Sequence, residues 1–187
     1  MKKLIQGWQI YFRCRSSDSS RRELFTLLWN QYQRQLIFFI QNMVRINAED
    51  LFQEVMLKVY RNLEKYSPAY SFNTWIYSIA RNHCINYLKK NRVIPVNCDG
   101  EAEEAYGAAD IVTPEKRSFD REVKLRIKDL LTGFDDENRQ IAFLYFYEEM
   151  KNHEIARIME IPTGTVKSRI HKIRAVLKKG LEEYYER

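Results

Sequence analysis

Cysteine is scarce in this 187-residue chain, and its three residues stand far apart. Cys14, Cys84 and Cys98 form no CxxC pair, and a sparse, odd set argues against a disulfide scaffold or structural zinc. His83 beside Cys84 is one pair of potential metal ligands, but no second pair completes a site. We therefore expect a protein of the reducing cytoplasm that holds no metal and no cofactor.

Long hydrophobic runs are also absent. No segment approaches the ~20 consecutive apolar residues of a membrane-spanning helix. The first five residues resemble the start of a signal peptide, but Gln6, Gly7, Gln9 and Arg13 interrupt the apolar run at once. We therefore expect a soluble, intracellular protein without membrane insertion.

Glycine and proline are few, with 6 and 4 residues, and no alternating Val/Ile/Thr-rich run stands out. Hydrophobic residues make up 45% of the chain and aromatic residues 13%, which is enough for a real core. These features predict an all-α protein.

Charge is distributed unevenly along the chain. Residues 1–94 hold 15 Lys and Arg against 6 Asp and Glu, residues 95–123 hold 3 against 8, and residues 124–187 hold 13 against 11. Two basic segments on either side of an acidic one suggest two modules that face nucleic acid, joined by a connector.

The C-terminal segment has the pattern of a helix-turn-helix. Apolar residues recur at helical spacing in two sets, with Pro162 and Gly164 between them. Ala156 is small where two helices must cross closely. The first set is Ile155, Ile158 and Ile161, and the second is Val166, Ile170, Ile173 and Leu177.

The second of these helices is cationic on one side. No acid occurs between Thr163 and Lys179, whereas six cations do: Lys167, Arg169, Lys172, Arg174, Lys178 and Lys179. One apolar stripe and one cationic, hydrogen-bonding face suit a DNA major groove. The alternative is a solvated basic helix on the surface.

The N-terminal half predicts three helices after a loosely attached leader over residues 1–18, in which a short turn of helix is expected from Trp8 to Phe12. The first begins near Arg21, spans roughly 25 residues, and buries Leu24, Leu27, Leu28, Tyr32, Leu36, Phe39 and Met43. The second begins at Ala48, with acids in its first turn. The third runs from about Phe72 to Lys90, after a turn at residues 66–71. Aromatic, amide and cationic groups on this third helix suit unstacked single-stranded DNA, with plain core aromatics as the alternative.

Between Pro95 and about Ser118 the hydrophobic period disappears and acids stand among Gly and Ala. This pattern predicts a flexible acidic linker, whose simplest role is that of a tether. A helix over about residues 121–131 follows, and Asp135 or Asp136 is expected to cap the next one, with Ile141, Leu144, Tyr145 and Tyr147 facing inward.

Three blocks of residues together resemble the extracytoplasmic-function (ECF) sigma factors of bacterial RNA polymerase. Residues 50–55 (DLFQEV) resemble region 2.2 of that family, residues 72–82 (FNTWIYSIARN) resemble regions 2.3 and 2.4, and residues 161–169 (IPTGTVKSR) resemble region 4. Asn86 stands where the family usually has Asp, and Lys151 where it usually has a capping Ser.

The resemblance implies a role for each block. Docking on the β′ clamp helices of the polymerase falls to Asp50, Gln53 and Glu54. By this resemblance, seven residues melt the minus-10 promoter element and capture a flipped base: Ser67, Tyr70, Phe72, Thr74, Tyr77, Arg81 and Asn82. Trp75 is implied to support them from a buried position. At the duplex minus-35 element, the base-facing candidates are Lys167, Ser168, His171 and Lys172, and the phosphate-facing ones are Arg169 and Arg174.

The resemblance also implies a domain plan and partners. After the leader at 1–18, residues 19–94 correspond to sigma region 2, residues 95–119 to the acidic linker and residues 120–187 to sigma region 4. The implied partners are core RNA polymerase, through its β′ and β subunits, promoter DNA and an anti-sigma factor. In the family the linker threads toward the catalytic cleft and the RNA exit path.

Two other functions compete with this interpretation. A homodimeric regulator of duplex DNA would need no polymerase-docking surface, and residues 53 and 54 and the aromatic third helix count against it. A nucleic-acid enzyme would need paired carboxylates at a metal site, a phosphate loop or a nucleophile. Apart from Asp50 and Glu54, one turn apart on a helix, the sequence offers none of these. We therefore expect a protein that binds rather than catalyses.

Overall fold

The computed structural model describes residues 7–44, 47–91, 123 and 125–185, and the predicted acidic linker at 95–119 lies outside them. Every secondary-structure element in these residues is a helix. Two compact units are present. One contains Met1–Pro95 together with His153–Glu160, and the other contains Val96–Asn152 and Ile161–Arg187.

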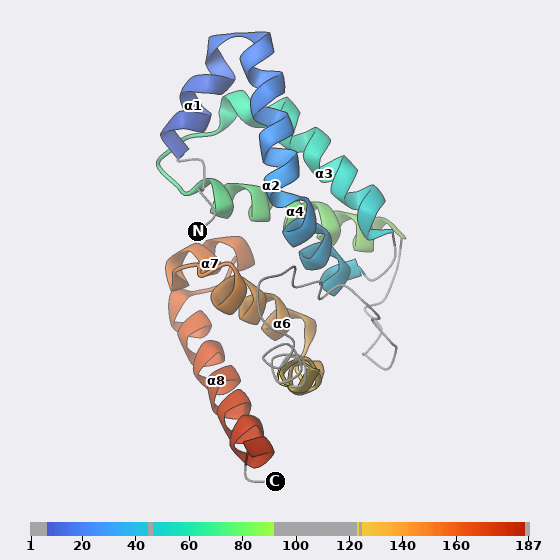
Figure 1. Ribbon diagram of the computed structural model, residues 1–187, viewed down its shortest axis with the longest axis vertical. Helices are drawn as coiled ribbons and strands as arrows, with labels where there is room; N and C mark the ends of the chain where they lie inside the picture. Colours follow the sequence, from blue (N-terminus) through green and yellow to red (C-terminus); the bar gives the residue numbers. More distant parts are fainter. Residues whose placement is uncertain (1–6, 45–46, 92–122, 124, 186–187) are drawn as a thin grey trace, which may run out of the picture. The chain divides into compact units, whose positions relative to one another are not determined.

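The first unit is built on α2 (Asp18–Val44), which packs against α1 (Gly7–Ser16), α3 (Ala48–Asn62) and α4 (Phe72–Asn91) (Figure 1). A short 3₁₀ turn, η1 (Leu63–Lys65), extends α3. The core of the first unit contains residues from all four helices, among them the fully buried Ile10, Leu28, Val55 and Ile76. Apolar residues at helical spacing therefore form the core that the sequence predicts, except that Leu27 is 45% exposed although the stripe includes it.

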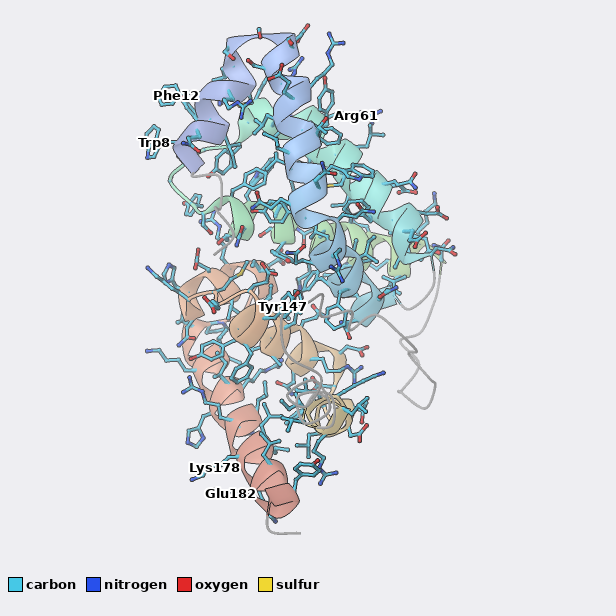
Figure 2. All side chains as sticks on the ribbon, in the orientation of Figure 1. Trp8, Phe12, Arg61, Tyr147, Lys178 and Glu182 are labelled. Atoms are coloured by element: carbon cyan, nitrogen blue, oxygen red, sulfur yellow. The ribbon has the colours of Figure 1, made fainter. Side chains whose placement is uncertain are left out.

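Residues 7–16 correct the prediction of a loosely attached leader. They form α1, whose Ile10 and Cys14 are buried at 0% and 3% exposure against the rest of the unit. Gly7 lies where any Cβ would collide with the Tyr66 hydroxyl, so glycine permits α1 to approach the segment before α4. The periodicity of this helix is weak because its outer face carries Trp8 and Phe12, both more than half exposed (Figure 2).

In the second unit, residues 125–132 are helical, close to the predicted 121–131, and α6 (Asp136–Ala142) and α8 (Thr163–Tyr185) pack against each other. Asp135 caps α6, since its carboxylate accepts the backbone N–H of Asn138 at 2.7 Å, which confirms the predicted cap. Gly180 lets the Leu130 side chain lie directly on α8, because a Cβ there would overlap it.

A π-helical turn, η2 (Phe143–Tyr147), follows α6. Ile141 and Leu144 are fully buried, as predicted, but Tyr147 is 60% exposed and not inward-facing. The wider π turn shifts the register of the residues that follow it, so helical spacing extrapolated from Ile141 places Tyr147 wrongly.

The helix-turn-helix consists of α7 (Asn152–Met159), a turn, and α8. Glu160 adopts a left-handed backbone with φ 57°, and the Val166 N–H bonds the Pro162 carbonyl at 3.2 Å to start α8. Pro162 precedes the helix, while Gly164 lies within its first turn and does not interrupt it.

Candidate nucleic-acid and polymerase interfaces

Three surfaces contain the residues that the sequence singles out. We call them the α3 face (Asp50, Gln53 and Glu54), the α4 face (residues 67–71 with the exposed side of α4) and the α8 face (Lys167, Ser168, His171 and Lys172). The first two lie in the first unit and the third lies in the second.

The α3 face borders a shallow pocket. Its three polar residues are exposed, and they line a pocket of about 460 Å³ together with Phe25, Trp29 and Leu57. Leu57 is 48% exposed. The arrangement offers an apolar floor and an acidic, hydrogen-bonding rim, which suits an apolar anchor flanked by cationic groups.

Aromatic rings support the pocket from below. The Trp29 ring meets the Phe52 ring edge-on with centroids 4.8 Å apart, and Phe25 contacts Tyr60 in the same way at 5.0 Å. Phe52 is 2% exposed, so these contacts fix Trp29 to the core of the unit. Sequence reasoning missed Phe25, Trp29 and Leu57 as lining residues; the exposed position of Leu57 beside the stripe of Leu51, Val55 and Val59 is the signal that could have found them.

At the α4 face, the segment before α4 is well ordered by local bonds. The Ser71 hydroxyl accepts the Thr74 N–H at 3.2 Å and lies 2.7 Å from the Thr74 hydroxyl, and the Tyr66 hydroxyl donates to the Tyr70 carbonyl at 2.9 Å. Tyr70 is 49% exposed, and Ser67 and Asn82 are also exposed. These three side chains are accessible, and their contact with the DNA strand stays a prediction.

Three other residues predicted to face the DNA strand are buried. Tyr77 is 0% exposed and its ring meets the Phe39 ring edge-on at 5.1 Å, while Phe72 is 4% exposed and packs on Tyr66. Thr74 is 2% exposed. The outward orientation predicted for Thr74 and Tyr77 is wrong, and Phe72 is not open to a flipped base, because α4 packs against both α2 and α3 and buries a wider arc than a single stripe.

The rest of α4 is intermediate in exposure. Arg81 is half-buried, and its Nε has no hydrogen-bond partner among the described residues. Trp75, expected to be buried, is only partly so and lies 5.3 Å from the Phe72 ring. The exposed strand-facing candidates are therefore Ser67, Tyr70 and Asn82, with Arg81 at their edge.

At the α8 face, all four base-facing candidates are exposed on one helix whose other side buries Val166, Ile170 and Ile173. This confirms the predicted division of α8 into an apolar stripe and a polar face. The Ser168 hydroxyl donates to the Thr165 carbonyl of its own helix at 2.9 Å. Farther along, Lys178 lies 3.6 Å from Glu182 (Figure 2).

The two arginines that are predicted to contact phosphates also bond α8 to other residues of the second unit. Arg169 Nη1 lies 2.6 Å from a Glu137 carboxylate oxygen at the start of α6, and the Arg174 guanidinium donates to the Tyr145 hydroxyl and lies 5.0 Å from its ring centre. Glu137 and Tyr145 were not predicted, because a partner distant in sequence leaves no local signal.

Other chemistry is limited in the part of the chain described here. Burial raises the pKa of the Cys84 thiol to about 12, so it is a packing residue and not a nucleophile at neutral pH. Among the described residues no group of three or more His, Cys, Asp or Glu is placed to hold a metal ion. None of the described helices combines the length and apolar character needed to cross a bilayer.

Comparison with known proteins matches two stretches of the chain. Residues 28–93 match the family model of sigma-70 region 2, and residues 126–177 match that of sigma-70 region 4. The chain is similar to the RNA polymerase sigma-H factor of Pseudomonas aeruginosa, with 29% identity over 185 residues that cover 95% of this chain and 94% of that one. It is also similar to the ECF RNA polymerase sigma-E factor of Haemophilus influenzae, with 30% identity over 168 residues that cover 86% and 89%.

A solved structure has a similar fold. The sigma factor RpoE in complex with the anti-sigma factor NepR from Bartonella quintana superposes with a TM-score of 0.61 at 18% identity, covering 84% of this chain and 96% of that chain.

Proposed function

Because this chain belongs to the ECF family of RNA polymerase sigma factors, we propose that its three surfaces divide the steps of promoter-specific initiation among them. As a member of this family, the protein binds core RNA polymerase and directs it to promoter DNA. The α3 face docks on the polymerase, the α4 face holds the opened minus-10 strand, and the α8 face reads the minus-35 duplex.

The observation that carries this proposal is the pocket at the α3 face. A regulator that binds only duplex DNA has no use for an exposed apolar floor rimmed by Asp50, Gln53 and Glu54, since such a surface repels a polyanion. The rim complements a cationic protein surface, and the apolar floor supplies affinity once water is excluded. The same chain therefore contains both this docking surface and the exposed, cationic α8 face.

At the α8 face, the residue types suit base readout. Lys172 and Lys167 can donate to guanine O6 and N7, and Ser168 and His171 can bond several base edges. Arg169 and Arg174 are released from Glu137 and Tyr145 when phosphates compete for them, so that they bind the backbone and set the register of α8.

At the α4 face, Tyr70 supplies a ring for an unstacked base and Asn82 supplies hydrogen bonds, with Arg81 near the phosphates. Phe72, Thr74 and Tyr77 act from beneath as the packing that fixes this surface. The protein contributes binding and not catalysis, and RNA synthesis remains with the polymerase. Its place is the cytoplasm, where the polymerase acts.

A protein inhibitor is a further proposed partner. RpoE of Bartonella quintana was solved with the anti-sigma factor NepR bound, and its fold resembles this chain. We propose that an anti-sigma factor regulates this protein by covering its docking or DNA-binding surfaces.

Charge reversal at the α3 face tests the proposal. Asp50→Lys with Glu54→Lys should abolish copurification with core polymerase, because two cations would face the cationic partner. Glu49→Lys is the matched control, since Glu49 is exposed on the same helix but does not line the pocket. Normal holoenzyme assembly by the double variant, with melting curves that show intact folds, would contradict the docking role.

A further inference from the structure

An imidazole from α4 lies between two charged residues of the α3 face. His83 is only 9% exposed. Its Nε2 lies 2.8 Å from Glu54 Oε2, and its Nδ1 lies 2.6 Å from Lys58 Nζ. Glu54 and Lys58 are one turn apart on α3, so His83 connects both to the neighbouring helix α4 (Figure 1).

The chemistry of these three groups fixes the proton on the ring. A lysine ammonium can only donate, so Nδ1 must accept, and the neutral ring then carries its hydrogen on Nε2. Glu54 Oε2 lies 2.8 Å from that nitrogen, so its carboxylate is within reach of the hydrogen. Burial and the Lys58 charge lower the pKa of His83 and so favour the neutral ring. The Glu54 carboxylate acts in the opposite direction but does not outweigh them.

The contact matters because the Glu54 side chain otherwise lies on the surface. Its side chain is 61% exposed and carries a carboxylate at the rim of the pocket. Ordering such a side chain on binding costs conformational entropy, and a side chain already held in place loses less. A neutral donor also leaves the carboxylate its full charge for a cationic partner.

We infer that His83 is a positioning residue of the docking surface, which holds the Glu54 carboxylate in place for the polymerase through its Nε2–H. The inference rests on the proposed docking role of the α3 face. It assigns a function to a buried polar residue that contacts neither DNA nor polymerase in the proposed scheme. The tautomer that Lys58 selects places the hydrogen on Nε2, the ring nitrogen nearest Glu54.

A double-mutant cycle with core polymerase tests this inference. His83→Leu, which removes the donor at similar volume, should weaken binding of the full chain about five- to tenfold, since a charge-assisted bond is lost. In the Glu54→Gln background the same change should have almost no effect. His83→Gln, which keeps an amide donor, should restore most of the affinity. Cys84→Ala, a change at the buried neighbour, controls for a general loss of stability.

The outcomes separate the two proposals. Equal weakening by His83→Leu in both backgrounds, or failure of His83→Gln to restore binding, would show that His83 only supports the fold and would overturn the inference alone. Wild-type affinity of Glu54→Gln itself would remove the docking role of Glu54, and the inference with it.

The tautomer offers a readout that needs no polymerase. In ¹⁵N spectra of histidine-labelled protein, with His83 assigned by its absence in His83→Leu, the ring should appear neutral with its proton on Nε2 at pH 7. Lys58→Met should reduce this preference. A ring protonated on Nδ1, or an equal mixture of tautomers, would overturn the inference.

Discussion

Lys172 is the residue on which the proposed base readout is most directly tested. It is exposed on the α8 face, one position from His171, on a helix whose opposite side is buried. Lys172→Ala should weaken binding to the cognate minus-35 duplex by about 1–3 kcal/mol if the lysine reads a base. Binding is measured by fluorescence anisotropy at fixed salt.

Lys178→Ala is the matched control for this prediction. Lys178 is exposed on the same helix but lies 3.6 Å from Glu182, away from the four candidate residues. It should change affinity little. An unchanged affinity of Lys172→Ala for the cognate duplex would remove Lys172 from the readout.

Two tyrosines near the α4 face separate packing from DNA contact. Tyr77→Ala should lower the free energy of unfolding by about 3–5 kcal/mol, because a fully buried ring is removed from its contact with Phe39. Tyr70→Ala should change stability by less than about 0.5 kcal/mol, since its ring is half exposed. Urea denaturation measures both.

Tyr70→Ala, which should affect stability less than Tyr77→Ala, should have the larger effect on strand opening. Tyr70→Ala should reduce permanganate reactivity of minus-10 thymines in the polymerase complex while it leaves closed-complex formation intact. Wild-type reactivity in Tyr70→Ala, or an unfolding energy of Tyr77→Ala equal to that of the wild type, would contradict the division between these two residues.

The sequence predicts orientation well only where a residue type has one habitual environment. Lys167, Lys172, Asp50 and Glu54 are exposed as predicted, because a charged head group is rarely buried. Tyr77 carries both a ring and a hydroxyl and suits either environment. Which one it occupies depends on α2 lying across α4, and helical spacing within residues 72–91 contains no information on that contact.

At the scale of elements, α1 is the largest departure from the sequence prediction. Ile10→Ala should lower the free energy of unfolding of the first unit by about 2–5 kcal/mol, because the side chain is fully buried where α1 packs on α2. Gln9→Ala, an exposed change on the same helix, is the control. Equal stability of the two variants would restore the leader as a loosely attached segment.

The long helix α2 was predictable from the sequence, whereas the short helix α1 was not. The spacing of Leu24, Leu28 and Leu36 predicts α2 over nearly its full length, because the same pattern repeats along its 27 residues. α1 has fewer than three turns, and two of its largest side chains are exposed, so its period is obscured. The π turn after α6 likewise breaks the register that places Tyr147.

At the scale of the molecule, the distribution of charge and the order of motifs indicate the function from the sequence. The α3 and α8 faces come from segments more than 100 residues apart. The residue types of the α8 face indicate a nucleic acid, and the resemblance to the ECF family implies the polymerase partner of the α3 face. What the sequence could not give is the apolar pocket behind the α3 face, because Phe25 and Trp29 come from α2 and Leu57 from α3. The same holds for the connection of Glu54 to His83.

The most direct test of the account is run-off transcription. Core RNA polymerase is mixed with the full chain on a library of genomic fragments from its source, and transcripts are sequenced. The account predicts transcripts that begin at a shared promoter class, appear only when the chain is present and disappear with the Asp50→Lys, Glu54→Lys variant. Transcription no different from that of core polymerase alone, while the chain binds duplex DNA by itself, would contradict it.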